Sequence, residues 1–287
     1  MHMSNAESLP RQLAHITIRI ECPLDSGQCS IGTGFFFAFK EEANGAMVPG
    51  IITNKHVLKG ANKIILRFTA ANSDNTPRIG SIHVFSIDDF ATRWLPHPDP
   101  DVDLAVIPVG ELLANEKASG SPLYFKTVGK SHIPLKDRLL QFSALEDIVL
   151  IGYPIGLWDS VNNMPIFRKG ITATQPGLNY EGRHEFLIDA ACFPGSSGSP
   201  VFRYRPALGL NSSGGIQITG DAPQLSLLGV LHAGPQQTVE GRLEVVTIPT
   251  QQTTVPVSRI PINLGFVIRS ERILEFEPII EKLLVST

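Results

Sequence analysis

Short runs of strand-forming residues, separated by Gly, Pro, Asn and Asp, recur along most of this 287-residue chain. Residues 16–20 (I-T-I-R-I) alternate apolar and polar side chains, which is the two-residue period of a half-buried β-strand. Similar runs lie at 64–68, 103–109, 148–153, 166–172, 185–190, 200–204, 225–232 and 264–268. Many short strands bounded by turn residues are typical of an all-β sandwich or barrel.

The strand pattern is interrupted once near the middle of the chain. Residues 110–134 form a connector with a helical pattern at 111–117. We therefore predict an N-terminal β-domain at residues 1–118 and a C-terminal β-domain at residues 119–287.

The last residues change period and predict a C-terminal helix. Ser270 is a candidate N-cap, and Pro278 should kink or restart the helix. One face of this helix carries Ile273, Phe276, Ile280 and Leu283, which we expect to pack on the second domain.

Residues 193–202, F-P-G-S-S-G-S-P-V-F, carry the strongest chemical signal. Ser197 lies directly before Gly198 and two residues after Gly195. Glycines allow a tight turn with positive φ. Such a turn can expose one hydroxyl and direct backbone N–H groups to the same point, as an activated nucleophile and an oxyanion hole require. A plain loop between two strands is the alternative interpretation.

A serine hydroxyl needs a base, and the usual base is a histidine oriented by a buried carboxylate. His56 lies in I-I-T-N-K-H-V-L, just after a short apolar run. Asp103 opens the apolar run D-L-A-V-I-P-V between His56 and Ser197. The chain order is therefore His, Asp, Ser, which is the order of the chymotrypsin arrangement.

Four motifs and a later pair together resemble those of the trypsin-like, chymotrypsin-fold serine peptidases. They are G-T-G-F-F-F, T-N-K-H-V, D-L-A-V, G-S-S-G-S-P and the later pair L-G-V-L-H-A-G and N-L-G-F-V-I, between residues 32 and 268. The resemblance is greatest to the bacterial high-temperature-requirement proteases and glutamyl endopeptidases. It implies an all-β fold of two six-stranded antiparallel β-barrels with a C-terminal helix, and a catalytic triad of His56, Asp103 and Ser197 in the cleft between them.

Each predicted triad residue has competitors nearby in the sequence. His83 and His97 lie outside the T-N-x-H-V pattern and are interpreted as surface histidines. Asp99 and Asp101 flank Pro100, which indicates a solvated turn. The remaining competitors, Ser196 and Ser199, lack the Gly-x-Ser-Gly frame.

The resemblance also implies the roles of the residues around Ser197. The backbone N–H groups of Gly195 and Ser197 would form the oxyanion hole. The specificity pocket would be lined by Ala191, Cys192, His232, Ala233 and Gly234. Ala191 stands where trypsin-type enzymes place an aspartate, so a strict preference for Lys or Arg is not expected. His232 would favour Glu or Gln before the scissile bond, with small apolar residues as the alternative preference, or it is simply satisfied within its strand.

A further departure concerns activation. Animal trypsins use an aspartate immediately before the nucleophile to bind a new N-terminus, and this chain has Ser196 there. We therefore do not expect that activation. Narrow specificity, a misfolded oxyanion loop or a regulatory partner protein remain as possible restraints, and the loops at 205–224 and 234–261 are candidates for setting specificity.

Composition limits the partners and the compartment. The net charge of −3 gives no reason to expect nucleic acid or an anionic membrane, and eight His and three Cys show no metal-ligand spacing. We expect protein or peptide substrates, no cofactor and no metal. The first residues lack a signal-peptide pattern, and three cysteines favour free thiols over a Cys22–Cys29 bridge, so we expect a cytoplasmic protein, or a secreted one if a leader has been removed. A catalytically silent trypsin-fold binding or scaffold protein is the alternative function.

Overall fold

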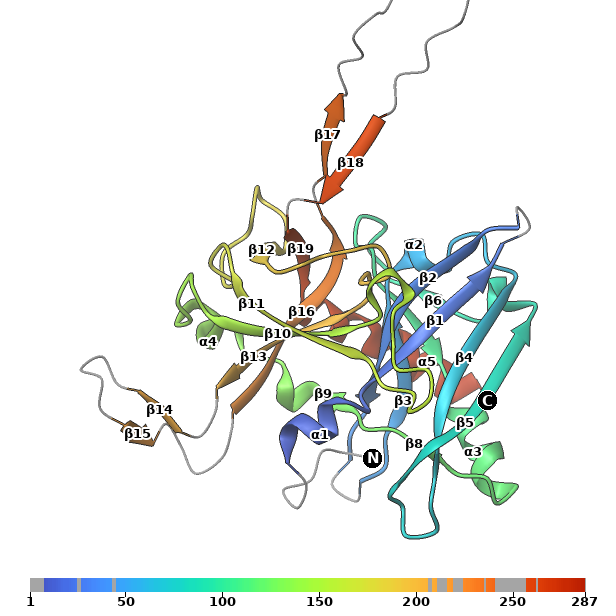
Figure 1. Cartoon of the computed structure of the whole chain (residues 1–287). Helices are drawn as coiled ribbons and strands as arrows, with labels where there is room; N and C mark the ends of the chain where they lie inside the picture. Colours follow the sequence, from blue (N-terminus) through green and yellow to red (C-terminus); the bar gives the residue numbers. More distant parts are fainter. Residues whose placement is uncertain are drawn as a thin grey trace, which may run out of the picture.

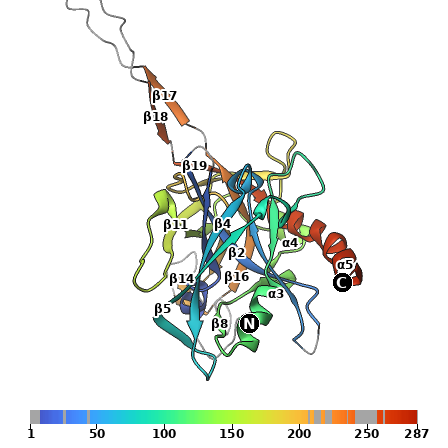
Figure 2. The same cartoon turned by 90° about the vertical axis from the view of Figure 1, so that its right-hand side faces the viewer.

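The computed structural model describes residues 8–24, 27–42, 45–205, 208–210, 216–218, 224–234, 236–240, 257–261 and 263–286. Two β-structures lie side by side, and the C-terminal helix packs near both (Figures 1 and 2). The first contains β1 (Thr17–Pro23), β2 (Cys29–Phe39), β3 (Val48–Thr53), β4 (Lys63–Ala71), β5 (Pro77–Asp88), β6 (Leu95–Pro96), β7 (Ala105–Pro108), β8 (Leu123–Tyr124) and β9 (Val128–Gly129).

These nine strands form an open sheet in the order β5-β4-β1-β2-β3-β7-β6, with β8 on β4 and β9 on β2. The predicted six-stranded N-terminal barrel is therefore not what the described residues form. Its two end strands, β5 and β6, do not pair with each other. β6 is only two residues long and includes Pro96, which has no N–H to donate, so it cannot support another ladder.

The second structure is the predicted closed barrel. Its strands are β10 (Asp147–Gly152), β11 (Ile166–Thr172), β12 (Glu185–Asp189), β13 (Pro200–Arg205), β16 (Gln224–Ala233) and β19 (Leu264–Arg269). They close in the order β10-β11-β12-β19-β16-β13. Alternate side chains of these strands, among them Leu150, Phe186 and Leu228, fill its interior.

The two structures share one hydrophobic core. Phe37 and Ile52 of the sheet pack in the same cluster as Phe202 and Val230 of the barrel and Phe276 of the C-terminal segment. β8 and β9 belong to the first sheet although they lie beyond residue 118. The division at residue 118 stays a prediction.

The helices are short. They are α1 (Leu9–Leu13), α2 (Lys55–Leu58), α3 (Gly110–Ala118), α4 (Lys136–Leu140) and α5 (Glu277–Ser286), with 3₁₀ turns η1 (Phe90–Thr92), η2 (Lys130–His132), η3 (Pro154–Gly156) and η4 (Ser270–Phe276). α3 confirms the helix predicted at 111–117. Within the described residues, no helix is long and apolar enough to span a bilayer.

The C-terminal segment restarts beside Pro278, as predicted, because η4 ends at Phe276 and α5 begins at Glu277. Ile273, Phe276 and Ile280 are buried, but Leu283 is 44% exposed, so the buried face is shorter than predicted.

Much of the two long loops at 205–224 and 234–261 lies outside the described residues. Their described parts form two hairpins, β14 (Leu208–Leu210) with β15 (Ile216–Ile218), and β17 (Gln236–Glu240) with β18 (Val257–Pro261). The β17–β18 ribbon extends away from the barrel at the end of β16 and β19 (Figure 1). The cysteines Cys22, Cys29 and Cys192 are free thiols, so the alternative Cys22–Cys29 bridge does not form.

Candidate active site

α2 places His56 directly against Asp103. The helix starts just after β3, and Asp103 lies just before β7, which pairs with β3. Nδ1 of His56 lies 2.5 Å from Oδ2 of Asp103, and the His56 backbone N–H donates a 3.0 Å hydrogen bond to Oδ1. With its Nδ1–H donating to the carboxylate, the neutral imidazole carries its lone pair on Nε2. The two side chains are 47% and 27% exposed, so a substrate can reach the ring.

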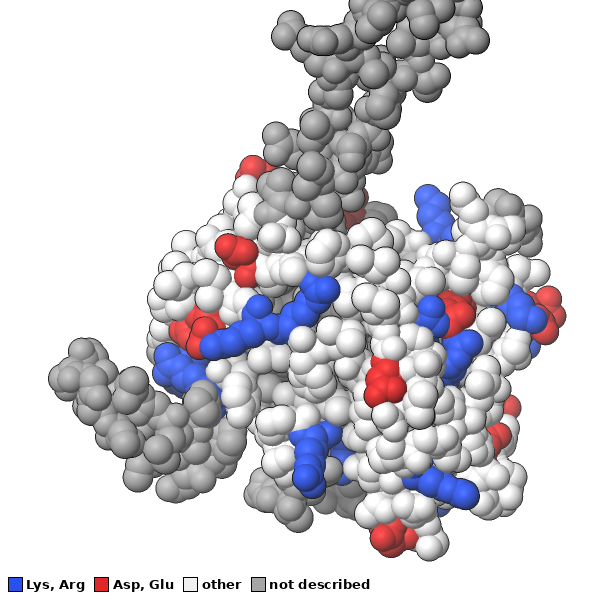
Figure 3. Space-filling view, in the orientation of Figure 1, with Lys and Arg blue, Asp and Glu red and all other residues white. Residues whose placement is uncertain are grey.

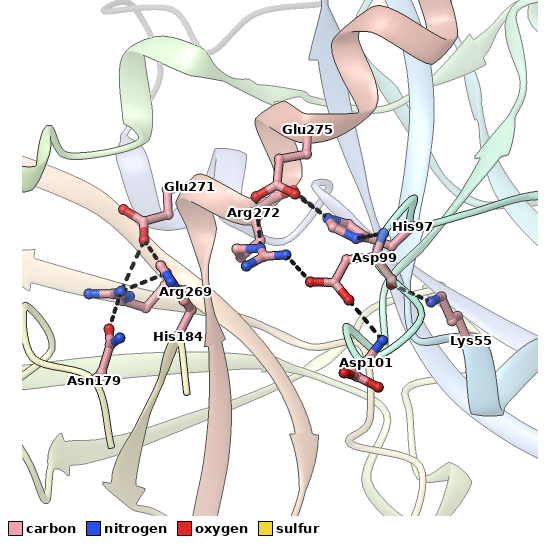
Figure 4. A network of polar contacts seen from close by, with 10 residues as sticks. All are labelled: Lys55, His97, Asp99, Asp101, Asn179, His184, Arg269, Glu271, Arg272 and Glu275. Carbon is pink, nitrogen blue, oxygen red and sulfur yellow. Dashed lines mark hydrogen bonds and ion pairs between the residues drawn. The ribbon is translucent and has the colours of Figure 1, made fainter. Parts of the chain in front are cut away.

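A polar network braces the loop that carries Asp103 (Figure 4). Nε2 of His97 is 3.0 Å from the carbonyl oxygen of Arg272 in η4, and Nδ1 accepts a 3.1 Å hydrogen bond from the Asp99 N–H. Arg272 Nη2 donates a 2.7 Å hydrogen bond to Oδ2 of Asp99. Lys55, next to His56, donates to the Asp99 carbonyl at 2.9 Å. Contacts from Arg272 in the C-terminal segment thus hold the loop between His97 and Asp103 in place.

His97 is therefore not the surface histidine that the sequence predicts. It is 3% exposed because η4 covers it, and its ring packs edge-on against Phe276 at 5.1 Å. Burial is the main reason that the pKa of His97 is lowered, although hydrogen bonding and Glu275 oppose this effect. A neutral ring agrees with this hydrogen bonding, because Nδ1 of His97 needs a lone pair to accept the hydrogen bond from the Asp99 N–H.

The Ser197 loop contains a tight turn just before the serine. The N–H of Ser196 donates a 2.9 Å hydrogen bond to the Phe193 carbonyl, and Gly195 at the third turn position has φ +87°. Proline at the second position and a positive φ at the third are the features of a type II turn. Gly198 also has φ +87°, and a Cβ there would collide with the carbonyl oxygen of Thr33.

This turn orients the predicted oxyanion hole. The Pro194 carbonyl accepts a 2.5 Å hydrogen bond from the Ile155 N–H. Because a trans peptide points its C=O and N–H in opposite directions, the Gly195 N–H faces away from Ile155. Within the described residues, neither the Gly195 N–H nor the Ser197 N–H has a protein acceptor. Two unpaired N–H groups on either side of Ser196 are what an oxyanion requires.

Thr33 of β2 holds both of these residues from the other side. Its hydroxyl donates a 2.9 Å hydrogen bond to the Gly195 carbonyl, and its backbone N–H donates a 2.8 Å bond to the Ser197 carbonyl. The same hydroxyl accepts a 3.1 Å bond from the Tyr153 N–H. Thr33 is fully buried, so these bonds are shielded from water.

The loop after β10 is anchored on the first sheet. The guanidinium groups of Arg19 and Arg67 both lie over the ring of Trp158, with their carbons 5.5 and 5.6 Å from the ring centroid. Between this anchor and β10, Ile155 adopts φ +52°, which is rare for a β-branched residue. Ile155 is also the residue whose N–H donates to the Pro194 carbonyl. The backbone strain therefore lies at a contact that holds the Ser197 loop.

His56 and Ser197 are brought to the same junction through shared neighbours. A Cβ on Gly198 would lie 2.6 Å from the Thr53 hydroxyl, and Thr53 is three residues before His56. Within the described residues, no hydrogen bond joins the Ser197 hydroxyl to His56. A hydrogen bond between His56 and the Ser197 hydroxyl is therefore a proposal and not an observation.

Several predicted pocket residues meet at the end of the barrel. A Cβ on Gly265 would lie 2.7 Å from Sγ of Cys192, and one on Gly234 would lie 3.8 Å from Cβ of Cys192. Ala191 and Ala233 flank Cys192 and Gly234 in the chain. Cys192 is 9% exposed, and burial is the main reason that its pKa rises to about 11, so it is no nucleophile.

His232 faces two carboxylates. Its Nε2 lies 3.4 Å from Oε1 of Glu185, and its Nδ1 lies 4.0 Å from Oδ2 of Asp103. The contact with His232 is the largest reason that the pKa of Glu185 is lowered, against the effect of burial. The distance to Asp103 is too long for a hydrogen bond, so Nδ1 can still bind another oxygen.

Sequence reasoning missed Thr33, Ile155 and Trp158, which hold the oxyanion loop. A signal for Thr33 was present, because Gly32 and Gly34 flank it in the G-T-G motif. A Cβ on Gly32 would lie 2.5 Å from Val57, so these glycines mark close packing around this strand. Nothing local marks Ile155 or Trp158.

Charges give no indication of a nucleic-acid partner on the face that Figure 3 shows. Lys and Arg are interspersed there with Asp and Glu among the described residues, and most of the surface is uncharged. Nucleic-acid sites instead cluster basic residues on one face. Among the described residues, no group of three or more His, Cys, Asp or Glu is arranged to hold a metal ion.

Several solved structures match this chain at low sequence identity. They include the HtrA-type protease AlgW with a tripeptide, at 18% identity over 97% of this chain and 64% of that chain, with a TM-score of 0.45. A serine endoprotease from Yersinia pestis matches at 18% identity over 95% and 64%, with a TM-score of 0.44. Deg5 matches at 18% identity over 78% and 81%, with a TM-score of 0.43.

This chain thus spans 64% of the length of the first two of these structures. A comparison with curated proteins found no match. The model of the trypsin-like peptidase domain matches residues 32–207, which include His56, Asp103 and Ser197. The chain belongs to the trypsin-like peptidase family.

Proposed function

We propose that the chain is a serine endopeptidase that cleaves proteins or peptides through an acyl-enzyme. Ser197 is the nucleophile, His56 the general base and Asp103 the carboxylate that orients His56. The observation that carries the proposal is the 2.5 Å contact between His56 Nδ1 and Asp103 Oδ2, at the junction where Thr33 holds the Ser197 loop. This contact fixes the tautomer that presents Nε2 to a nucleophile.

The proposed reaction follows from these positions. Nε2 of His56 takes the Ser197 hydroxyl proton as the oxygen attacks the substrate carbonyl. The N–H groups of Gly195 and Ser197 stabilise the resulting oxyanion. His56 then passes the proton to the leaving amine, and water repeats the cycle to release the acyl group. Asp103 stays ionised throughout and stabilises the imidazolium.

A fluorophosphonate probe tests this proposal directly. We expect the probe to label the native protein and mass spectrometry to place the adduct on Ser197, because only an activated serine beside an oxyanion hole reacts readily. Heat-denatured protein is the control. Labelling no faster than the denatured control would refute the peptidase and favour the silent binding or scaffold protein.

The pocket supports a proposed preference for Glu or Gln, or else small apolar residues, before the scissile bond. Ala191 leaves the floor without a carboxylate for Lys or Arg. Gly234 and Gly265 add no side-chain bulk around Cys192. We propose that His232 donates a hydrogen bond from Nδ1 to a side-chain oxygen of the substrate while its Nε2–H faces Glu185, so that the Glu185 carboxylate offsets the charge of the doubly protonated ring.

This role predicts a particular effect of His232→Ala. Glu and Gln share the side-chain oxygen, so kcat/KM should fall about tenfold for both relative to Leu, as loss of one hydrogen bond implies. Peptides that differ only at this position provide the measurement. His184→Ala removes another histidine outside the cleft and serves as the control. An equal fall for Glu, Gln and Leu would instead mean that His232 acts on Asp103.

A further inference from the structure

Arg168 reaches the backbone of the predicted specificity pocket from inside the barrel. It lies on β11 opposite Leu150, whose side chain belongs to the barrel interior. Nη1 of Arg168 donates a 2.6 Å hydrogen bond to the carbonyl oxygen of Ala191, the predicted floor residue. Its guanidinium carbon lies 4.8 Å from the centroid of the Phe193 ring. The guanidinium is therefore fixed behind residues 191–193.

This cation lacks a matching anion. Among the described residues, no carboxylate oxygen lies within 4.0 Å of the Arg168 guanidinium. The next residue, Lys169, lies 3.3 Å from Asp147, and the buried Arg203 pairs with Glu146 at 2.7 Å. Arginine remains charged at any physiological pH and has five N–H donors, of which the Ala191 bond uses one.

The charge of Arg168 extends to the wall of the pocket. Burial is the main reason that the Cys192 pKa is raised, and the next largest effect is the opposing field of Arg168. Asp189 acts on the same thiol more weakly and in the other direction. Arg168 is therefore the stronger of the two charges at Cys192, whose side chain contacts Gly234 and Gly265.

We propose that Arg168 is a specificity-determining residue that selects an acidic side chain before the scissile bond. The proposal rests on the peptidase function above and assigns the charge recognition to Arg168, whereas His232 supplies only a hydrogen bond. A carboxylate that enters over Ala191 meets a fixed, uncompensated guanidinium, and such charge-assisted bonds are about twice as strong as neutral ones. Glu and Gln have the same shape, so their ratio reports the charge alone.

The test compares peptides with Glu, Gln or Leu at that position. For the wild type we expect kcat/KM to favour Glu over Gln by about tenfold or more at low salt, and less at high salt. Arg168→Gln should reduce the Glu/Gln ratio to about one while it keeps a donor for the Ala191 carbonyl. Arg168→Lys should retain the preference for Glu, because it keeps the charge. Lys169→Met, which removes the neighbouring charge, should leave the ratio unchanged.

Two readouts separate this proposal from the proposed function. Fluorophosphonate labelling reports the Ser197 nucleophile and not the peptide, so Arg168→Gln should still be labelled on Ser197 far above the heat-denatured control. A wild type that cleaves Gln as fast as Glu, or an Arg168→Gln variant with the wild-type ratio, overturns the proposal while the peptidase stands. If no peptide is cleaved, the peptidase fails, and binding of Glu over Gln peptides to the Ser197→Ala variant still decides the role of Arg168.

Discussion

Replacing Ser197 by Ala should lower kcat by roughly three decades or more while the fold is retained. The variant would lose the proposed nucleophile, and only the proposed oxyanion hole and substrate binding would remain to accelerate hydrolysis, as in Ser-His-Asp enzymes. Ser197 lies in a loop between β12 and β13, and its backbone carbonyl keeps its bond from Thr33 in the variant. Peptide hydrolysis under saturating substrate, with thermal unfolding in parallel, gives the measurement.

Ser199→Ala is the matched control for this prediction. Ser199 is fully buried, and its hydroxyl has no hydrogen-bond partner among the described residues, so its removal should affect the free energy of unfolding little. Its backbone N–H still bonds to the Ser196 carbonyl. An active Ser197→Ala together with an inactive Ser199→Ala would show that the nucleophile is misassigned.

The strands were predictable because their cause is local. The run predicted at 264–268 is β19 at Leu264–Arg269, and the run at 148–153 is β10 at Asp147–Gly152. The alternation of apolar and polar residues lies within each segment, so a strand can be predicted without knowing which strand it pairs with. Closure of a sheet is different, because it depends on whether its two end strands meet. The ends of the first sheet are the long β5 and the two-residue β6, and Pro96 in β6 is the one local sign that they do not pair.

The same distinction applies to the candidate site. The pairing of His56 with Asp103 was predicted from motifs that lie next to apolar strands, and the structure brings the two side chains together. The burial of His97 was not predicted, because its P-H-P surroundings are polar and its cover comes from Arg272, 175 residues away. The bond from Thr33 to Gly195 spans 162 residues. Such contacts depend on tertiary packing, which a single sequence does not reveal.

Thr33→Val should lower kcat by about a hundredfold with little change in KM. Valine has the shape of threonine but no hydroxyl, so the Gly195 carbonyl loses its donor and the Tyr153 N–H loses its acceptor. The Gly195 peptide then loses its side-chain support and is held by backbone bonds alone, among them that of Pro194 to the strained Ile155. Loss of one oxyanion donor costs about 10²–10³ in kcat, and a donor that is misplaced for part of the time should cost somewhat less.

Two further variants separate this positioning role from general destabilisation. Thr33→Ser keeps the hydroxyl and should restore kcat to within about tenfold of the wild type. Thr172 is also fully buried, and its hydroxyl donates to the Ala144 carbonyl at 2.6 Å and accepts from the Glu146 N–H at 2.9 Å. Thr172→Val therefore loses the same two kinds of bond, about 1–3 kcal/mol of stability for each unpaired group, away from the Ser197 loop. Thr33→Val and Thr172→Val should unfold at similar temperatures, but only Thr33→Val should react slowly with a fluorophosphonate. If the two react equally fast, the hydroxyl of Thr33 stabilises the fold and does not position the oxyanion hole.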